Sequence, residues 1–222
     1  MGTFTDIGSV VEAIRAAEIH SPTRGHPRLI VGIAGAPGAG KSTVGAALVH
    51  LLGPAAVLLP MDGFHLAQAT LVELGRRDRM GAPDTFDVAG LVAMLGEVRR
   101  AAGTVLAPAF DRRVEEPVPE AIVIRAEVRT VVVEGNYLLL DTGGWESVAP
   151  LLDLTFFVEV DRGIRLARLI ERHIAFGKSA ENARAWAFGP DEANARLILP
   201  TAARAEHIIR VQQRVEDISK RP

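Results

Sequence analysis

The fold of this chain is decided by Gly35-Ala36-Pro37-Gly38-Ala39-Gly40-Lys41-Ser42-Thr43, which follows the apolar run 29–34 and precedes the apolar run 44–52. This order predicts a buried strand, a glycine-rich loop and a helix. Glycines let the loop turn without a Cβ penalty, so its N–H groups and the start of the helix can converge on one anion. We interpret the stretch as a phosphate-binding loop.

The residue types within the loop fit that interpretation. Lys41 can reach the β- and γ-phosphates of a nucleotide as a point charge, and the hydroxyl of Ser42 can bind Mg²⁺, with Thr43 in support. Lysine occurs only at positions 41, 178 and 220, so the one lysine in the first three quarters of the chain stands where phosphate binding needs it. The alternative is a glycine-rich turn that binds nothing.

Composition bounds the remaining classes of protein. With 222 residues, 48% of them hydrophobic, the chain can bury one substantial core, and residues 1–222 are expected to form a single domain. A net charge of −2 without a basic run argues against nucleic acid or a membrane surface as partner. The absence of cysteine excludes disulfides and thiolate catalysis. No signal-peptide pattern and no apolar run of about 18 residues occurs, so we expect a cytoplasmic protein.

Apolar, strand-like runs alternate with helical patterns along most of the chain. This alternation predicts an α/β fold with a mostly parallel sheet, helices on both faces and ligands at the carboxyl ends of the strands. Segment 1–27 is expected to hold an amphipathic helix over 5–18 and a linker before the first core strand. Further expected strands are 55–60, 104–108, 130–133, 154–160 and 207–211, and expected helices include 87–101 and 162–176.

An acidic residue follows the second strand of the predicted sheet. Asp62 ends the run 56–61, which places its carboxylate beside the phosphate loop. A hydroxyl that attacks a γ-phosphoryl group must be oriented and must lose its proton, and an aspartate can serve both needs. Asp62 is therefore the candidate base, with a helix N-cap as the alternative. His65 is either a substrate contact or a structural histidine.

The strand 130–133 also ends in an acid. Glu134 stands where P-loop proteins place a carboxylate that holds Mg²⁺ directly or through water. A surface glutamate at a strand end is the alternative. Gly135 lets the backbone approach a ligand closely, and Tyr137 is expected to pack near that ligand.

Three arginines recur along the helical pattern 162–176. Arg165, Arg168 and Arg172 are three and four residues apart, so they share one helical face. Such a row suits a lid that closes on a nucleotide and spreads the charge of the transition state. The alternative is a solvated face paired with Glu171. The segments 81–87 and 107–113 could shape an acceptor pocket, although spacing alone favours turns.

Together these motifs resemble the group of uridine kinases, bacterial pantothenate kinases and phosphoribulokinases. The resemblance is closest to the branch of nucleoside/nucleotide kinase-like or fructose-transport-system kinases, and it runs from about residue 28 to about 211. The aromatic-rich acceptor region of uridine kinases has no match here, which leaves the acceptor open. The matching motifs are Gly-Ala-Pro-Gly-Ala-Gly-Lys-Ser-Thr (35–43), Met-Asp-Gly-Phe-His (61–65), Gly-Ala-Pro-Asp-Thr-Phe-Asp (81–87), Pro-Ala-Phe-Asp-Arg (108–112), Val-Glu-Gly-Asn-Tyr-Leu-Leu (133–139) and the arginine-rich segment 162–173.

The resemblance implies a P-loop three-layer fold with a five-stranded, mostly parallel sheet, a kinase core at 28–211 and a helical lid at about 162–200. It implies ATP and Mg²⁺ as cofactors and a small-molecule hydroxyl as acceptor, and dimers are common in the group, which allows a homodimer. The implied catalytic residues are Asp62, Lys41 and Arg168, with Ser42 and Glu134 at the metal.

Further residues carry over by position in the same way. Arg165 joins the loop 35–43 in binding the nucleotide, and Asn194 is a candidate for the adenine site. Arg112 lies in the segment that contributes to acceptor sites in relatives. The residues expected to face the acceptor are thus Asp62, His65, Arg112, Glu134 and Tyr137.

Two classes of function remain in view at this point. The leading hypothesis is an ATP-dependent kinase for a small hydroxyl compound. The rival is a regulatory or energy-transducing NTPase without such an acceptor. A guanine-specific switch normally carries an Asn-Lys-x-Asp element, and the chain contains no Asn-Lys pair; the Ser-Gly-Gly signature of transporter ATPases is absent as well.

Overall fold

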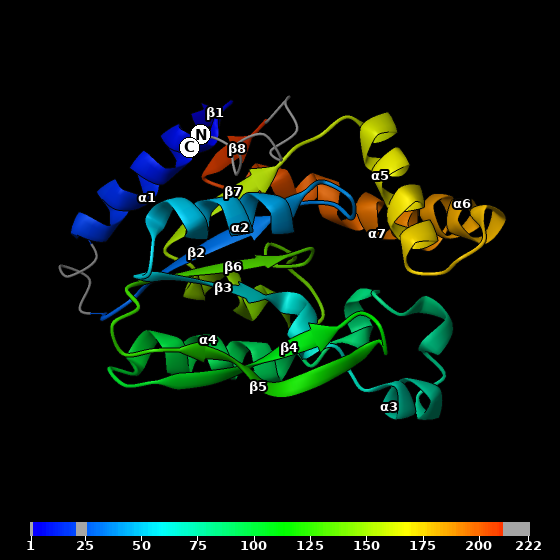
Figure 1. Ribbon diagram of the computed structural model, residues 1–222, viewed down its shortest axis with the longest axis horizontal. Coiled ribbons are helices and arrows are strands. Elements are labelled where there is room, and N and C mark those ends of the chain that lie inside the picture. Colours follow the sequence, from blue (N-terminus) through cyan, green and yellow to red (C-terminus); the bar gives the residue numbers. More distant parts are fainter. Residues whose placement is uncertain (1, 21–25, 211–222) are drawn as a thin grey trace.

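A computed structural model describes residues 2–20 and 26–210, and at its centre lies a parallel six-stranded sheet (Figure 1). The strand order is β1-β8-β7-β2-β6-β3, and each neighbouring pair is parallel. A separate two-stranded antiparallel sheet joins β4 to β5. The bounds are β1 Gly2–Phe4, β2 Leu29–Ala34, β3 Ala56–Pro60, β4 Val105–Asp111, β5 Glu116–Ile124, β6 Thr130–Gly135, β7 Leu154–Val158 and β8 His207–Ile209.

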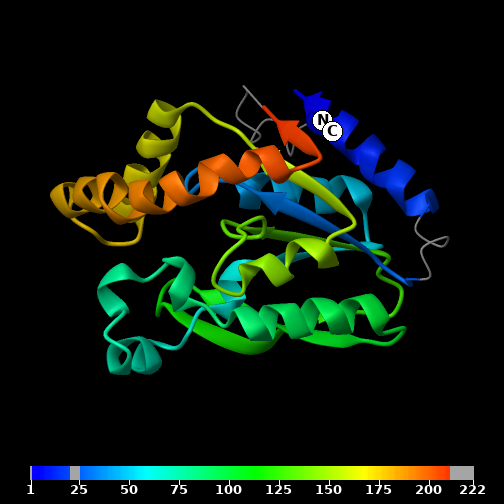
Figure 2. The same ribbon diagram turned by 180° about the vertical axis from the view of Figure 1, so that it is seen from behind.

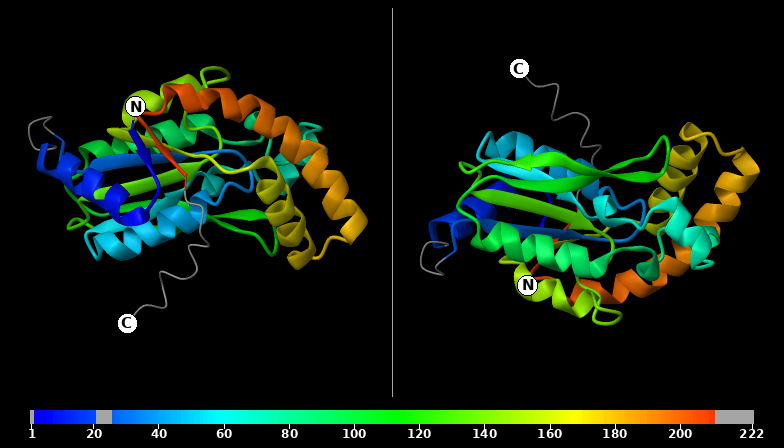
Figure 3. Two further views of the ribbon diagram at one scale, coloured as in Figure 1. Left: turned by 90° about the horizontal axis from the view of Figure 1, so that it is seen from above. Right: turned by 90° about the horizontal axis from the view of Figure 1, so that it is seen from below.

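Helices cover both faces of the parallel sheet (Figure 3). Along β2, Ile30 packs into a cluster with the apolar side of α4, whereas Val31 and Ile33 pack into a second cluster with α1 and α2. Side chains of β2 therefore pack into a hydrophobic core on each face of the sheet, and every residue of β2 is buried. The helices are α1 Ile7–His20, α2 Lys41–Leu52, α3 Gln68–Glu73, α4 Val88–Arg100, α5 Arg162–Ala175, α6 Ala180–Phe188 and α7 Pro190–Ile198. None of the helices in the described ranges is long and apolar enough to cross a membrane.

Strand register brings the functional segments to one edge. In β2 and β6, Ile33 pairs with Glu134 and Ala34 with Gly135, so the phosphate-binding loop begins beside Glu134. In β3 and β6, Pro60 pairs with Glu134, which places the residues after β3 at the same edge. This convergence is the usual ligand position of an open parallel sheet.

The helices α5, α6 and α7 project together beyond this edge (Figures 1 and 2). Helices α5 and α6 pack through a small cluster of Leu166, Leu169 and Ala187. Asp161 caps α5 by accepting from the main-chain N–H groups of residues 163 and 164, and Ser179 caps α6. We call residues 162–198 the lid.

The structure confirms the three-layer α/β fold and corrects two details. The parallel sheet has six strands rather than five, because the short strand β1 pairs with β8 at its edge. The run 104–108 belongs to the antiparallel pair β4-β5 and not to the parallel sheet. Its partner β5 carries Pro117 and Pro119, which cannot donate ladder hydrogen bonds and therefore suit an edge strand. Residues 21–25 of the expected linker and residue 211 of the last expected strand lie outside the described residues.

Candidate active site

The loop between β2 and α2 has the backbone shape of an anion cradle. Gly38 and Gly40 have φ values of 79° and 94°, a region that favours glycine. A Cβ on Gly38 would also stand 2.6 Å from the carbonyl oxygen of Arg165, so the loop packs directly against α5. Helix α2 begins at Lys41, and its first N–H groups and dipole therefore point to the same place.

Lys41 is buried at the base of this loop. Its Nζ donates a hydrogen bond of 3.1 Å to the carbonyl oxygen of Ala36. Burial lowers the pKa of Lys41 to about 8, and the carboxylates of Glu134 and Asp62 partly oppose that shift. Because nearby carboxylates only partly offset the cost of burying its charge, the ammonium group of Lys41 is suited to bind a polyanion.

Ser42 and Glu134 meet at the carboxyl edge of the sheet. The hydroxyl of Ser42 donates to Glu134 Oε1 at 2.8 Å. Burial raises the pKa of Glu134, and the negative charge of Asp62 raises it further. Two oxygen donors beside a phosphate cradle fit Mg²⁺, which takes few protein ligands and keeps phosphate and water oxygens. The described residues contain no group of three or more His, Cys, Asp or Glu side chains that could hold a metal by themselves. Thr43 is exposed on α2 and does not line the cavity.

Asp62 lies in a short 3₁₀ turn, Met61–Phe64, that directly follows β3. Its Oδ2 accepts a hydrogen bond of 2.6 Å from Arg112, which follows β4. A Cβ on Gly63 would lie 2.4 Å from the carbonyl oxygen of Pro108, so only glycine allows the turn and the β4-β5 pair to come this close. The side chain of Asp62 caps no helix, which removes the N-cap alternative.

His65 packs between two aromatic rings. Its ring centroid lies 4.0 Å from that of Phe86 and 4.5 Å from that of Phe110. The Nδ1 atom is 2.8 Å from the main-chain carbonyl oxygen of Asp62. Burial lowers the pKa of His65.

Tyr137 and Asn194 converge on the carbonyl group of Gly81, a residue that lines the cavity. The hydroxyl of Tyr137 donates to the carbonyl oxygen of Gly81 at 2.6 Å, and Asn194 Nδ2 donates to the same atom at 3.2 Å. Neither side chain lines the cavity, and the acceptor role expected for Tyr137 and the adenine role expected for Asn194 stay predictions. Both residues hold the turn at 81–85 in place.

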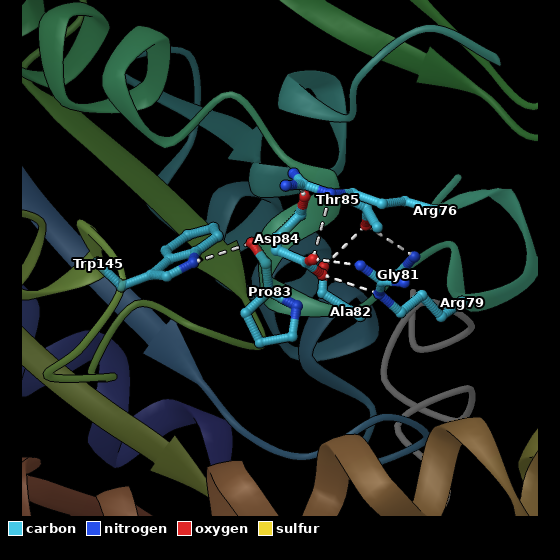
Figure 4. A network of polar contacts seen from close by, with 8 residues as sticks. All are labelled: Arg76, Arg79, Gly81, Ala82, Pro83, Asp84, Thr85 and Trp145. Atoms are coloured by element: carbon cyan, nitrogen blue, oxygen red, sulfur yellow. Dashed lines mark hydrogen bonds and ion pairs between the residues drawn. The ribbon is translucent and has the colours of Figure 1, made fainter. Parts of the chain in front are cut away.

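The segment 81–85 is a turn, as its sequence predicted, and many hydrogen bonds and ion pairs join its polar groups to one another and to neighbouring side chains (Figure 4). The main-chain N–H of Gly81 donates to Thr85 Oγ1, which itself donates to the carbonyl oxygen of Ala82. Arg76 and Arg79 both pair with Asp84. Trp145 Nε1 adds a 3.2 Å bond to the carbonyl oxygen of Pro83.

The three lid arginines have different surroundings. Arg165 is buried, donates to the carbonyl oxygen of Pro37 at 3.2 Å and pairs with Glu192. Arg168 Nη1 lies 3.5 Å from the carbonyl oxygen of Ala39 and does not line the cavity. Arg172 does line it, and burial lowers its pKa.

The expected row of arginines is therefore present on α5, and within the described ranges none of the three pairs with Glu171. Arg172 rather than Arg168 is the member that faces the open space.

One cavity of about 500 Å³ is bordered by Lys41, Ser42, Asp62, His65, Arg112, Glu134 and Arg172. Its walls come from the phosphate loop, the turn after β3, the end of β6, the β4-β5 turn and the lid. Sequence reasoning placed the loop, Asp62, His65, Arg112 and Glu134 there. The wall residues Phe86 and Phe110 lie in the segments 81–87 and 107–113, which the sequence offered as parts of an acceptor pocket. Sequence reasoning did not assign the wall residues Arg77, His173, Lys178, Trp186 and Asp191, for which the sequence carries no signal beyond their residue types.

Known proteins are similar to this chain in sequence and in fold. A sequence model described as "Phosphoribulokinase / Uridine kinase family" matches residues 30–219. The uncharacterized protein YggC of Escherichia coli strain K12 is 34% identical over 209 residues, which cover 92% of this chain and 85% of that protein. A Schizosaccharomyces pombe protein named as a candidate uridine kinase, C227.14, is 34% identical over 166 residues, or 69% of each chain.

A crystal structure of similar shape comes from Silicibacter sp. TM1040. That protein is named as a candidate fructose transport system kinase, and it matches with a TM-score of 0.82 and 33% identity over 91% of this chain and 98% of its own. The fold and loop define a P-loop kinase of the α/β class. The chain belongs to the phosphoribulokinase and uridine kinase family.

Proposed function

We propose that this protein is an ATP-dependent kinase that transfers the γ-phosphoryl group to a hydroxyl of a small molecule. The observation that carries the proposal is the arrangement of Lys41, Asp62, Glu134 and Arg172 around a single cavity at the carboxyl edge of the sheet. A phosphate-binding cation, a base, a metal-binding carboxylate and a transition-state cation are the parts that phosphoryl transfer requires.

Each group has a separate role in this mechanism. The N–H groups of the loop and Lys41 would bind the phosphates, and Ser42 and Glu134 would hold Mg²⁺, which neutralises charge on the transferred group. Asp62 orients the acceptor hydroxyl and takes its proton. Arg172 stabilises the negative charge that develops during transfer.

Arg112 acts on the base rather than on the phosphates. Its guanidinium group donates a hydrogen bond of 2.6 Å to Oδ2 of Asp62, and among the described residues no group binds the other carboxylate oxygen, which is left for the acceptor. Because Arg112 also lines the cavity, it can contact the acceptor directly.

The cavity favours a kinase over an NTPase without an acceptor. Beyond the phosphate loop the cavity continues to His65, Phe110 and Glu115. Binding of the nucleotide phosphates alone does not need this additional space. A space of about 500 Å³ lies within the size range of small-ligand sites.

Formation of ADP tests the proposal. Purified protein is incubated with ATP and Mg²⁺ and with single members of a panel of sugars, polyols, hydroxy acids, nucleosides and pantothenate. We expect one class to stimulate ADP formation, with a phosphorylated product visible by mass spectrometry. Stimulation by no panel member, combined with steady ATP hydrolysis, would favour the NTPase instead.

The location and the oligomeric state of the protein are also part of this proposal. We propose a cytoplasmic enzyme that acts without nucleic acid or membrane and that forms a homodimer. Sedimentation equilibrium tests the last point, because a monomer mass at all concentrations would contradict it.

A further inference from the structure

The imidazole ring of His65 is held in place by aromatic rings from two other segments of the chain. It lies in the slot between Phe86 and Phe110, at centroid distances of 4.0 and 4.5 Å. Phe86 comes from the turn before α4 and Phe110 from β4, so three separate segments fix one imidazole. Because His65 fills the slot, a planar ligand ring cannot enter between the two phenylalanines.

The hydrogen bond at Nδ1 determines which nitrogen carries the proton. The partner is the main-chain carbonyl oxygen of Asp62 at 2.8 Å, and a carbonyl can only accept. Nδ1 is therefore protonated. Burial lowers the pKa of His65, so the ring is neutral at neutral pH and Nε2 carries a free lone pair.

The Nε2 atom of His65 has no hydrogen-bond partner among the described residues and is not fully enclosed. Within the described ranges, Arg99 Nε is the only enclosed side-chain nitrogen or oxygen without a partner. His65 Nε2 makes no hydrogen bond among those residues and is not enclosed, and His65 lines the cavity. A hydrogen-bond acceptor of fixed direction is thus presented to any molecule that enters.

His65 and Asp62 are also neighbours in space. His65 directly follows the 3₁₀ turn that contains Asp62, and its main-chain N–H donates to the carbonyl oxygen of Asp62 at 3.1 Å, three residues back. A small molecule whose hydroxyl reaches Asp62 therefore has an adjacent group close to His65.

We infer that His65 Nε2 accepts a hydrogen bond from a second hydroxyl of the phosphate acceptor, on the carbon next to the one that is phosphorylated. The acceptor is thus a small polyhydroxylated compound, such as a sugar, a polyol or a hydroxy acid, and not a nucleoside. This inference rests on the proposed kinase function and adds a specificity-determining residue to it. A nucleoside 5′-hydroxyl has no hydroxyl on the neighbouring carbon, and the aromatic slot that could hold its base is filled.

Matched acceptors test the inference in the unmodified protein. ATP-dependent transfer is measured for glycerol against propane-1,3-diol, for glycerate against 3-hydroxypropionate, for D-ribose and D-fructose against their single-deoxy analogues, and for uridine. We expect kcat/KM to be about 10- to 100-fold lower for the analogue that lacks the neighbouring hydroxyl, because His65 Nε2 is then left unpaired. Equal use of both members of a pair, or preference for uridine, would overturn the inference and leave the kinase standing. If neither these compounds nor any member of the wider panel above is phosphorylated, the proposed function fails and the inference fails with it. Phosphorylation of pantothenate alone would overturn the inference and leave the kinase standing.

Two variants of His65 locate the effect. His65→Phe keeps an aromatic ring in the slot but removes the acceptor atom, so the preference for the hydroxylated member should fall to about one while ATP affinity and melting temperature stay close to wild type. His65→Gln returns an oxygen at similar reach and should recover part of the preference. A His65→Phe protein that folds and keeps the full wild-type preference would overturn the inference.

Discussion

Asp62 and Arg112 are fifty positions apart in the chain and form an ion pair with Nη2 2.6 Å from Oδ2 at the edge of the cavity. Asp62 follows a strand of the parallel sheet, and Arg112 follows a strand of the small antiparallel sheet. The contact therefore joins the nucleotide side of the site to the segment that forms its acceptor side.

Replacing Arg112 should impair acceptor use without unfolding the protein. The Arg112 side chain is 41% exposed, and exposed ion pairs contribute only about 0–1 kcal/mol to stability. We expect Arg112→Ala to lower kcat/KM for the acceptor about 10- to 100-fold, as loss of a charged hydrogen bond does. Arg210→Ala, which breaks an exposed pair with Glu159 away from the cavity, is the control and should change little. Equal effects of both variants in steady-state kinetics would contradict this role.

Replacing two arginines of α5 should reduce the rate of phosphoryl transfer to different extents. Arg172 lines the cavity, whereas Arg168 is turned toward the loop carbonyl at Ala39. Because an arginine that meets transition-state charge is worth about 10³-fold or more in rate, Arg172→Ala should reduce kcat by that order. Arg168→Ala should reduce it less. Single-turnover rates compare the two, and a larger loss at Arg168 would return the catalytic role to that residue.

The lowered pKa of Lys41 predicts how nucleotide affinity depends on pH. In the free protein this ammonium group loses its proton as pH rises through about 8. Bound phosphates favour the protonated form, so binding above pH 8 takes up a proton, and affinity for ATP and Mg²⁺ should fall as pH rises from 8 to 10. Calorimetry in buffers of different ionisation enthalpy measures this uptake. Lys41→Ala should bind weakly and lose the dependence, and a flat wild-type profile would speak against Lys41 as the phosphate ligand.

Replacing Gly63 with alanine should lower the free energy of unfolding. A Cβ on Gly63 would lie 2.4 Å from the carbonyl oxygen of Pro108, so Gly63→Ala must push the β4-β5 sheet away from the 3₁₀ turn. Overpacking of this kind costs about 1–3 kcal/mol. Gly103→Ala is the control, since a Cβ there meets nothing within 4 Å. Urea unfolding compares the variants, and equal stability would mean that the two segments are not held together.

The sequence predicted the parts of the site that depend on local pattern. A glycine-rich loop between a strand and a helix, and acids at the ends of the strands now seen as β3 and β6, can be recognised without knowing which segments meet. Register then brought Glu134 beside the loop, as parallel pairing requires. The strand β1 was missed because it has only three residues and is defined by its partner β8.

Contacts between distant segments could not be predicted in this way. Tyr137 was expected near a ligand because it follows Glu134, yet its hydroxyl binds the carbonyl oxygen of Gly81, fifty-six positions away. The choice of Arg172 over Arg168 depends on how α5 is rotated against the phosphate loop, and both residues share one face in the sequence pattern. The aromatic slot around His65 likewise needs three segments that no spacing rule connects.

The most direct test of the central claim is acceptor-dependent ADP formation by Asp62→Asn, measured beside ATP affinity. Asparagine keeps the shape of the side chain but cannot take the proton, so transfer to the acceptor should fall about 10²- to 10⁴-fold. Affinity for ATP and Mg²⁺ should change little, because the loop, Lys41 and the Ser42–Glu134 pair bind the phosphates and the metal. Acceptor-stimulated ADP formation that survives at the wild-type rate in Asp62→Asn would contradict the account.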